Sequence, residues 1–119
     1  MPIKAISTPL SPRQIAIINL LPVGDKVPIP TRTIASLLNT TLRIVRQDIN
    51  ALITQHGVPI GSKREGNAGY YLIENNEQRK NTLLPLYAQM QSENKRIEAL
   101  ETIDIVAFYE KKKAGAFTE

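Results

Sequence analysis

The first third of the chain contains two short groups of apolar residues with helical spacing, separated by a proline-rich loop. Ser11 and Pro12 are typical of a helix start, and the helix that follows should end before Pro22. Residues 22–30 contain three prolines, which predicts a loop with a short edge strand. A second short helix is expected over residues 31–38, with its first residue, a threonine, as the N-cap.

The clearest helical pattern follows Thr41, which can cap the first turn of a third helix. Val45, Ile49 and Leu52 recur at intervals of four and three residues, so they share one face of that helix. Asn39 can adopt the left-handed conformation that ends the preceding helix. Two short helices joined by such a turn are typical of a helix-turn-helix.

A glycine and two strand-like runs follow the third helix, which should end near residue 55. Gly57 is a suitable stop. Residues 58–60 and 70–73 flank a glycine-rich basic turn, and this arrangement predicts a β-hairpin. The order helix, helix, turn, helix, hairpin predicts an α+β fold that is mostly α, a winged helix-turn-helix.

A long fourth helix with a partial heptad pattern is expected next. Asn75 and Gln78 resemble a capping box, and Pro85 predicts a kink or a restart. Glu93 interrupts the apolar pattern. The pattern favours a dimerisation helix, with Asn94 as a polar residue that sets the register; a helix packed on its own domain is the alternative. The predicted dimerisation residues are Leu83, Leu86, Tyr87, Met90, Asn94, Ile97 and Leu100.

These elements divide the chain into four predicted parts. They are an N-terminal arm (1–10), a winged helix-turn-helix domain (11–75), a long helix (76–104) and a C-terminal tail (105–119).

Charge is distributed unevenly between the parts. Residues 1–73 carry eight Lys or Arg against three Asp or Glu, whereas residues 74–119 carry seven against eight. A basic first part joined to a charge-balanced second part suggests polyanion binding in one and assembly in the other.

Composition excludes most enzyme chemistry. The 119 residues include no cysteine and a single histidine, so thiol catalysis, Cys-ligated zinc and a multi-histidine metal site are ruled out. No nucleophile–base pair, carboxylate dyad or phosphate loop can be assembled, so we expect no enzyme, metal or cofactor. No apolar run approaches a membrane span and the N-terminus does not resemble a signal peptide, which predicts a cytoplasmic protein with no membrane partner.

The face of the third helix opposite its apolar stripe carries residue types that read DNA bases. Arginine can donate two hydrogen bonds to guanine, and glutamine and asparagine can pair in the same way with adenine. No acidic residue shares this face, although a solvated surface helix is the alternative interpretation. The residues expected to contact DNA from this helix are Thr41, Leu42, Arg43, Arg46, Gln47 and Asn50.

Two further groups are expected at the DNA backbone. Lys63 and Arg64 lie in the glycine-rich turn, where flexible backbone and two cations suit phosphate contact or entry into the minor groove. Arg32 and Thr33 begin the second helix, whose N-terminus can meet a phosphate.

The segment IASLLNTTLRIVRQDINAL, followed by HGVPIGSKREGNAGYYL, resembles the winged helix of the biotin-repressor type, also called the type 11 helix-turn-helix. The resemblance spans residues 11–73, with Asn39 in place of the usual turn glycine and Thr40 in place of the usual apolar residue. It does not extend to a biotin ligase domain, so it implies DNA binding without ligase activity. The residues that carry it are Ala35, Thr41, Val45, Ile49, Leu52, Gly57, Gly69 and Tyr70.

The layout also resembles small winged-helix proteins of phages and mobile elements of Gram-positive bacteria. Together these observations predict a homodimer that binds double-stranded DNA sequence-specifically, as a transcriptional regulator or as a phage replication or origin-binding protein. The alternative is a protein-interaction module that uses the long C-terminal helix to dock a partner protein.

Overall fold

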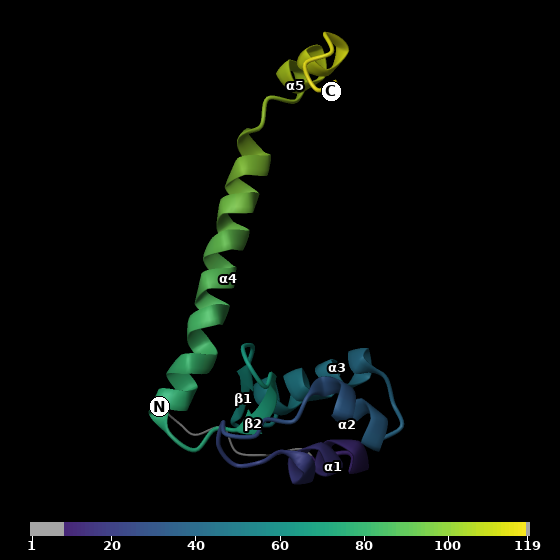
Figure 1. Cartoon of the computed structure of the whole chain (residues 1–119), viewed down its shortest axis with the longest axis vertical. Coiled ribbons are helices and arrows are strands. Elements are labelled where there is room, and N and C mark those ends of the chain that lie inside the picture. The colour runs from purple at the N-terminus through teal and green to yellow at the C-terminus, as the bar shows by residue number, and fades with distance from the viewer. Residues whose placement is uncertain (1–8, 119) are drawn as a thin grey trace. The chain divides into compact units, whose positions relative to one another are not determined.

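Helices and one antiparallel hairpin make up the computed structural model, which describes residues 9–118 (Figure 1). The chain divides into two compact units, one up to Leu84 and one from Pro85 onwards. The fold is α+β and mostly helical, as predicted. The arm predicted over residues 1–10 lies outside the described residues except for its last two positions. The elements are α1 (Pro12–Leu20), α2 (Thr31–Leu37), α3 (Leu42–Thr54), β1 (Ile60–Lys63), β2 (Gly69–Leu72), α4 (Asn76–Thr102) and α5 (Ile105–Lys113).

Side-chain caps begin α1 and α3 at the predicted residues. Ser11 Oγ accepts a hydrogen bond from the Gln14 amide at 3.1 Å, and Gln14 Oε1 accepts one from the Ser11 amide at 2.9 Å. Thr41 Oγ1 accepts a hydrogen bond from the Ile44 amide at 3.2 Å. These bonds satisfy first-turn amides that have no partner within the helix. The predicted starts of both helices are therefore confirmed.

Helix α2 begins differently from the prediction. Pro30 is its N-cap residue and Thr31 is the first helical residue, so no side chain caps this helix. The Pro30 carbonyl instead accepts hydrogen bonds from the amides of Thr33 and Ile34, at 3.0 and 3.1 Å. The predicted threonine cap was wrong because the extended backbone of Pro30 already turns the chain into the helix.

The turn between α2 and α3 is built on a left-handed residue. Asn39 has φ 52°, the only positive φ among the described residues other than glycine. The amide of Thr40 donates a hydrogen bond to the Ala35 carbonyl at 2.9 Å, which closes the end of α2. The predicted role of Asn39 is confirmed, and the turn needs no glycine.

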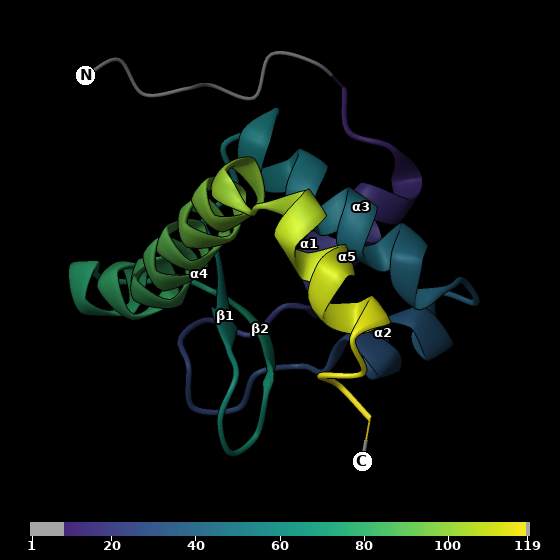
Figure 2. The same ribbon diagram turned by 90° about the horizontal axis from the view of Figure 1, so that it is seen from above.

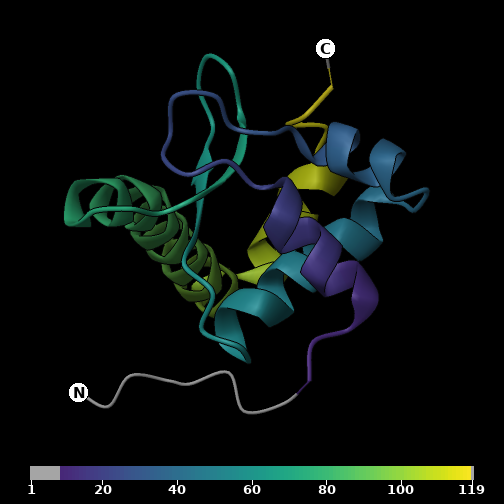
Figure 3. The same cartoon turned by 90° about the horizontal axis from the view of Figure 1, so that it is seen from below.

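The hairpin has a third segment along its outer edge. β1 and β2 pair antiparallel, with Ile60 opposite Leu72. On the other side of β2, Ile29 and Tyr70 exchange two backbone hydrogen bonds of 2.9 Å. Figure 2 and Figure 3 show this loop (residues 22–30, dark blue) beside the hairpin (teal). In place of the short edge strand predicted in the loop, two isolated bridges to β2 are present, Ile29 with Tyr70 and Val23 with Leu72.

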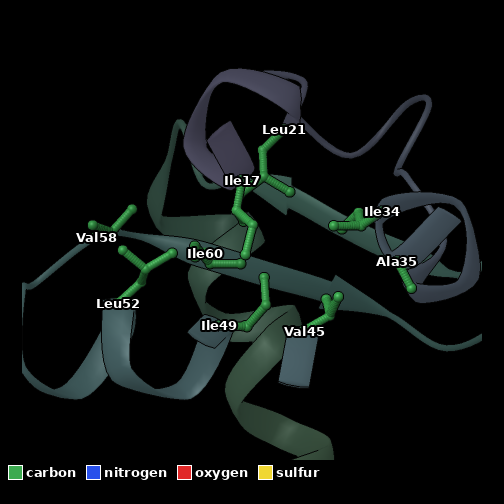
Figure 4. Close-up of a cluster of buried hydrophobic side chains, with 9 residues drawn as sticks. All are labelled: Ile17, Leu21, Ile34, Ala35, Val45, Ile49, Leu52, Val58 and Ile60. Carbon is green, nitrogen blue, oxygen red and sulfur yellow. The ribbon is translucent and has the colours of Figure 1, made fainter. Parts of the chain in front are cut away.

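One apolar core joins the three N-terminal helices to the base of the hairpin. Its side chains come from α1 and the residue after it, from α2, from α3 and from the start of the hairpin, and they point toward one another (Figure 4). The apolar stripe predicted on the third helix lies in this core. Its buried members are Ile17, Leu21, Ile34, Ala35, Val45, Ile49, Leu52, Val58 and Ile60.

The ring of Tyr71 connects the hairpin to the start of α4. It is 1% exposed and crosses Gly61, where a Cβ atom would lie 2.5 Å from the ring. The Tyr71 hydroxyl lies 3.3 Å from Thr82 Oγ1, which also accepts a hydrogen bond from the Ser62 amide at 3.3 Å. The first two turns of α4 are therefore fixed to the hairpin within the N-terminal unit.

The start of α4 matches half of the predicted capping box. Asn75 Oδ1 accepts a hydrogen bond from the Gln78 amide at 2.9 Å, as expected of an N-cap. The reciprocal bond differs from the prediction, because Gln78 Oε1 accepts from the amide of Glu74 at 2.9 Å. Gln78 is thereby buried at the junction of hairpin and helix.

The C-terminal part contains more regular structure than the sequence indicated. The restart expected near Pro85 does not occur, because α4 is one helix from Asn76 to Thr102. The segment predicted as a tail contains α5, which is capped by Asp104 through a 2.9 Å hydrogen bond from the Ala107 amide. No helix among residues 9–118 has the length and apolar character that crossing a membrane requires.

Candidate nucleic-acid interface

Helix α3 separates its apolar and polar residues on opposite faces. Val45 and Leu52 are fully buried, whereas Arg43, Arg46 and Gln47 are exposed. The remaining residues predicted to contact DNA from this helix are exposed as well, namely Thr41, Leu42 and Asn50. The hydrophobic core thus fixes the helix and leaves this polar face outward.

The only acidic residue of α3 is turned away from this face. Asp48 is 9% exposed and forms an ion pair with Arg13 of α1. Arg13 Nε donates a hydrogen bond to Asp48 Oδ2, and Nη2 donates one to Oδ1 at 3.3 Å. Accepting these bonds, and carrying the opposite charge, Asp48 raises the pKa of the Arg13 guanidinium. The carboxylate therefore neutralises a structural cation and does not oppose an anion at the polar face.

The two halves of this ion pair should differ in their effect on stability. In Arg13→Ala the Asp48 carboxylate stays in its nearly buried position without a cation, whereas in Asp48→Ala the partly exposed guanidinium of Arg13 remains hydrated. We expect Arg13→Ala to lower the midpoint of thermal unfolding by about 5 °C or more, and Asp48→Ala to lower it less. Circular dichroism melting measures both. Equal midpoints for the two variants and wild type would show that the pair does not stabilise the fold.

The cations of the candidate interface are not neutralised by acidic side chains. Within residues 9–118, neither Arg43 nor Arg46 forms an ion pair, and the same holds for Lys63 and Arg64. Side chains in this state keep their full charge for a phosphate or a base edge.

The turn of the hairpin gathers a third cation that the sequence did not single out. Lys63 ends β1 and Arg64 begins the turn, in which Gly66 has φ 66°. Asn67 Nδ2 donates a hydrogen bond to the carbonyl of Lys26 at 3.0 Å, so the loop that carries exposed Lys26 is held against the turn. The sequence offers only a weak signal for this cation, a turn sequence (Gly-Asp-Lys) between two prolines. The fold is what brings Lys26 to the hairpin.

The start of α2 has fewer backbone donors available for a DNA phosphate than the sequence suggested. Arg32 and Thr33 are both exposed in its first turn. The Thr33 amide, however, already donates to the Pro30 carbonyl at 3.0 Å. A contact with a phosphate there could use the Arg32 guanidinium, the Thr33 hydroxyl and the Arg32 amide, which donates no hydrogen bond to a described residue. Thr41 is similar, since its hydroxyl oxygen already accepts the capping hydrogen bond of α3.

The predicted dimerisation residues of α4 form a partly apolar, largely exposed surface. Leu83 is half-buried, and the others (Leu86, Tyr87, Met90, Asn94, Ile97 and Leu100) are exposed. Exposed apolar side chains are also present on and after α5, where the ring of Phe108 stacks on that of Phe117, beyond the helix end, with centroids 5.4 Å apart. Such a surface is typical of a protein contact site.

Within residues 9–118, no group of three or more His, Cys, Asp or Glu side chains is placed to hold a metal ion. The candidate interface consists of the polar, cationic face of α3 and the basic turn of the hairpin.

Comparison with models of known protein families, with curated proteins and with solved structures found no match for this chain.

Proposed function

We propose that this protein is a winged helix-turn-helix that binds double-stranded DNA sequence-specifically as a homodimer. The observation that carries the proposal is the polar face of α3. It presents Arg43, Arg46, Gln47 and Asn50 with no acidic residue, on a helix whose opposite face is buried. An ordinary surface helix mixes both signs of charge, whereas a helix in the major groove lies between two rows of phosphates, which favours cations and amides on its outer face.

Each element has a role in this proposal. Helix α3 lies in the major groove, with its arginines directed to guanine and its amide side chains to adenine. The hairpin is the wing, and its cations Lys63 and Arg64, with Lys26 of the adjoining loop, contact phosphates or enter the minor groove. Arg32 adds a backbone contact from α2. With this DNA-binding unit the protein would regulate transcription or bind the replication origin of a phage.

Salt-dependent binding to random duplex DNA tests the proposal and the role of the wing. Replacing both Lys63 and Arg64 by glutamine should weaken binding to all duplexes similarly. The slope of log K against log salt concentration should fall in magnitude by roughly two, because two fewer counterions are released. Fluorescence anisotropy with a labelled duplex measures both quantities.

A charge-matched variant in the other unit is the control for this experiment. Lys111→Gln combined with Lys112→Gln removes the same charge from α5 and should leave the slope unchanged. An unchanged slope for the wing variant would mean that the wing does not contact DNA. No salt-dependent binding by the wild-type protein would contradict the proposed function itself.

A protein-interaction module is the second candidate, favoured by the exposed apolar residues of α4 and α5. Ile105, Val106 and Phe108 are between 45% and 68% exposed. In this alternative the N-terminal unit is a scaffold and α4 docks a partner protein. A chain that is monomeric and does not bind duplex DNA at any salt concentration would favour this candidate.

A further inference from the structure

The loop of residues 22–30 follows the outer edge of the hairpin, and both of its ends are fixed to β2. Near its start, the amide of Gly24 donates a hydrogen bond to Leu72 O at 2.9 Å, and at its end Ile29 exchanges two hydrogen bonds with Tyr70. Between these points the loop runs beside the hairpin (Figure 2 and Figure 3). The position of its central part therefore depends on other contacts.

One hydrogen bond links the central part of this loop to the turn of the hairpin. Asn67 Nδ2 donates it to the carbonyl of Lys26 at 3.0 Å, across 41 positions of the chain. Among the described residues, Lys26 and Val27 form no other hydrogen bond or ion pair. Val27 is 73% exposed, so packing does not hold this stretch of the loop. The Asn67 side chain is therefore the contact that fixes the Lys26 backbone beside the turn.

The backbone of the turn does not require asparagine at position 67. Asparagine is common in turns because it tolerates a positive φ and because its side chain can bond to nearby backbone. Asn67 does neither, since Asn39 is the only described residue other than glycine with a positive φ, and the side-chain hydrogen bond of Asn67 goes to Lys26. The amide of Asn67 thus serves the distant loop and not the turn itself.

This hydrogen bond brings like charges together. It holds Lys26 beside the turn that carries Lys63 and Arg64, and none of the three cations forms an ion pair with a described residue. Glu65 of the same turn pairs with none of them. Cations gathered in this way repel one another in the free protein, and a bound polyanion relieves the repulsion.

We propose that Asn67 is a positioning residue for DNA binding, which holds Lys26 beside Lys63 and Arg64 so that the three cations meet the phosphates of one DNA strand. The inference rests on the proposed DNA-binding function, and it makes the loop a fixed part of the wing. Lys26 is the group that contacts DNA, and Asn67 acts only through Lys26.

The contact between Asn67 and the loop is tested first without DNA. Trypsin can cleave after Lys26 only when the backbone of the loop leaves the hairpin and enters the protease. Asn67→Ala should therefore raise the initial rate of cleavage after Lys26 by about threefold, as expected for the loss of one exposed hydrogen bond. Mass spectrometry of the fragments measures this rate. Asn81→Ala, which removes an exposed amide from α4, is the matched control and should leave the rate unchanged.

A double-mutant cycle then separates positioning from a structural role. Lys26→Gln should weaken binding to random duplex DNA by roughly fivefold and lower the magnitude of the salt slope by about one. Asn67→Ala should cause part of the same loss, but no further loss in a chain that already carries Lys26→Gln. Fluorescence anisotropy measures these affinities. Lys95→Gln, which removes an exposed cation from α4, is the charge-matched control and should change neither quantity.

Three outcomes would overturn the inference. An unchanged rate of cleavage in Asn67→Ala shows that the hydrogen bond does not fix the loop. Equal losses of affinity from Asn67→Ala with and without Lys26 assign Asn67 a structural role in the turn. Unchanged binding by Lys26→Gln, when wild type binds in a salt-dependent manner, shows that the loop does not contact DNA. The last result contradicts only this inference, whereas wild-type protein that does not bind duplex DNA contradicts the proposed function itself.

Discussion

Replacing Ile97 by aspartate is expected to dissociate the proposed dimer and to weaken binding to an inverted-repeat DNA site by about a hundredfold or more. Ile97 is one of the exposed apolar residues on one face of α4 (Leu86, Met90, Ile97 and Leu100), an apolar stripe that a second helix would bury in the proposed dimer. A carboxylate at this position would lose its water without gaining a cation. Each monomer would then bind one half-site alone and lose the gain from two linked contacts.

Light scattering and binding to inverted repeats of varied spacing measure these two effects. Ser92→Asp is the matched control, since it adds the same charge at an exposed position of α4 that lies off the stripe. It should leave both mass and affinity unchanged. Binding of random duplex by Ile97→Asp should persist, because the α3 face is intact. A dimer that survives Ile97→Asp would place the dimer contact elsewhere.

Replacing Arg46 by alanine should cost about 1–3 kcal/mol on the preferred DNA site and much less on random duplex. Arg46 is in the middle of the exposed face of α3 and has no ion-pair partner among the described residues. Its guanidinium can donate two hydrogen bonds to one guanine. Loss of a base contact removes discrimination, whereas loss of a phosphate contact weakens all sequences alike.

The preferred site must first be selected from a random duplex pool with the wild-type protein. Binding of Arg46→Ala and Arg43→Ala is then compared on the selected site and on random duplex. Arg79→Ala, an exposed cation on α4, serves as the control with equal loss of charge. Equal losses on both duplexes would make Arg46 a phosphate contact, and no loss on either would contradict the proposed role of α3.

Local signals in the sequence were sufficient for the N-terminal helices and the turn between them. Ser11 and Thr41 cap amides three residues further along the chain, and Asn39 turns the chain at its own position. Their roles therefore depend on few residues besides their sequence neighbours. The threonine at the start of α2 failed as a cap because Pro30, one residue earlier, already has the extended conformation of an N-cap. Residue type alone does not decide which of two adjacent residues becomes the N-cap of a helix.

Other features depend on contacts that no local pattern encodes. The ion pair between Arg13 and Asp48 joins residues 35 positions apart, and it exists only because α1 packs on α3. Lys26 reaches the hairpin turn because its loop pairs with β2, and its carbonyl accepts a hydrogen bond from the Asn67 side chain. Helix α5 did have a local signal, the Asp104 cap, but the three lysines and the glycine that follow resembled a frayed tail.

The hairpin has a consequence for how chains of this protein can associate. The strand amides that point away from the hairpin are already bound. Those of Ile60 and Ser62 donate to Val58 O and Thr82 Oγ1, and those of Tyr70 and Leu72 donate to Ile29 O and Pro22 O. A sheet edge whose outward amides are already bound offers a further strand only carbonyl oxygens, which makes it a poor template. Edge-to-edge aggregation and β-augmentation by a peptide are therefore disfavoured at this hairpin.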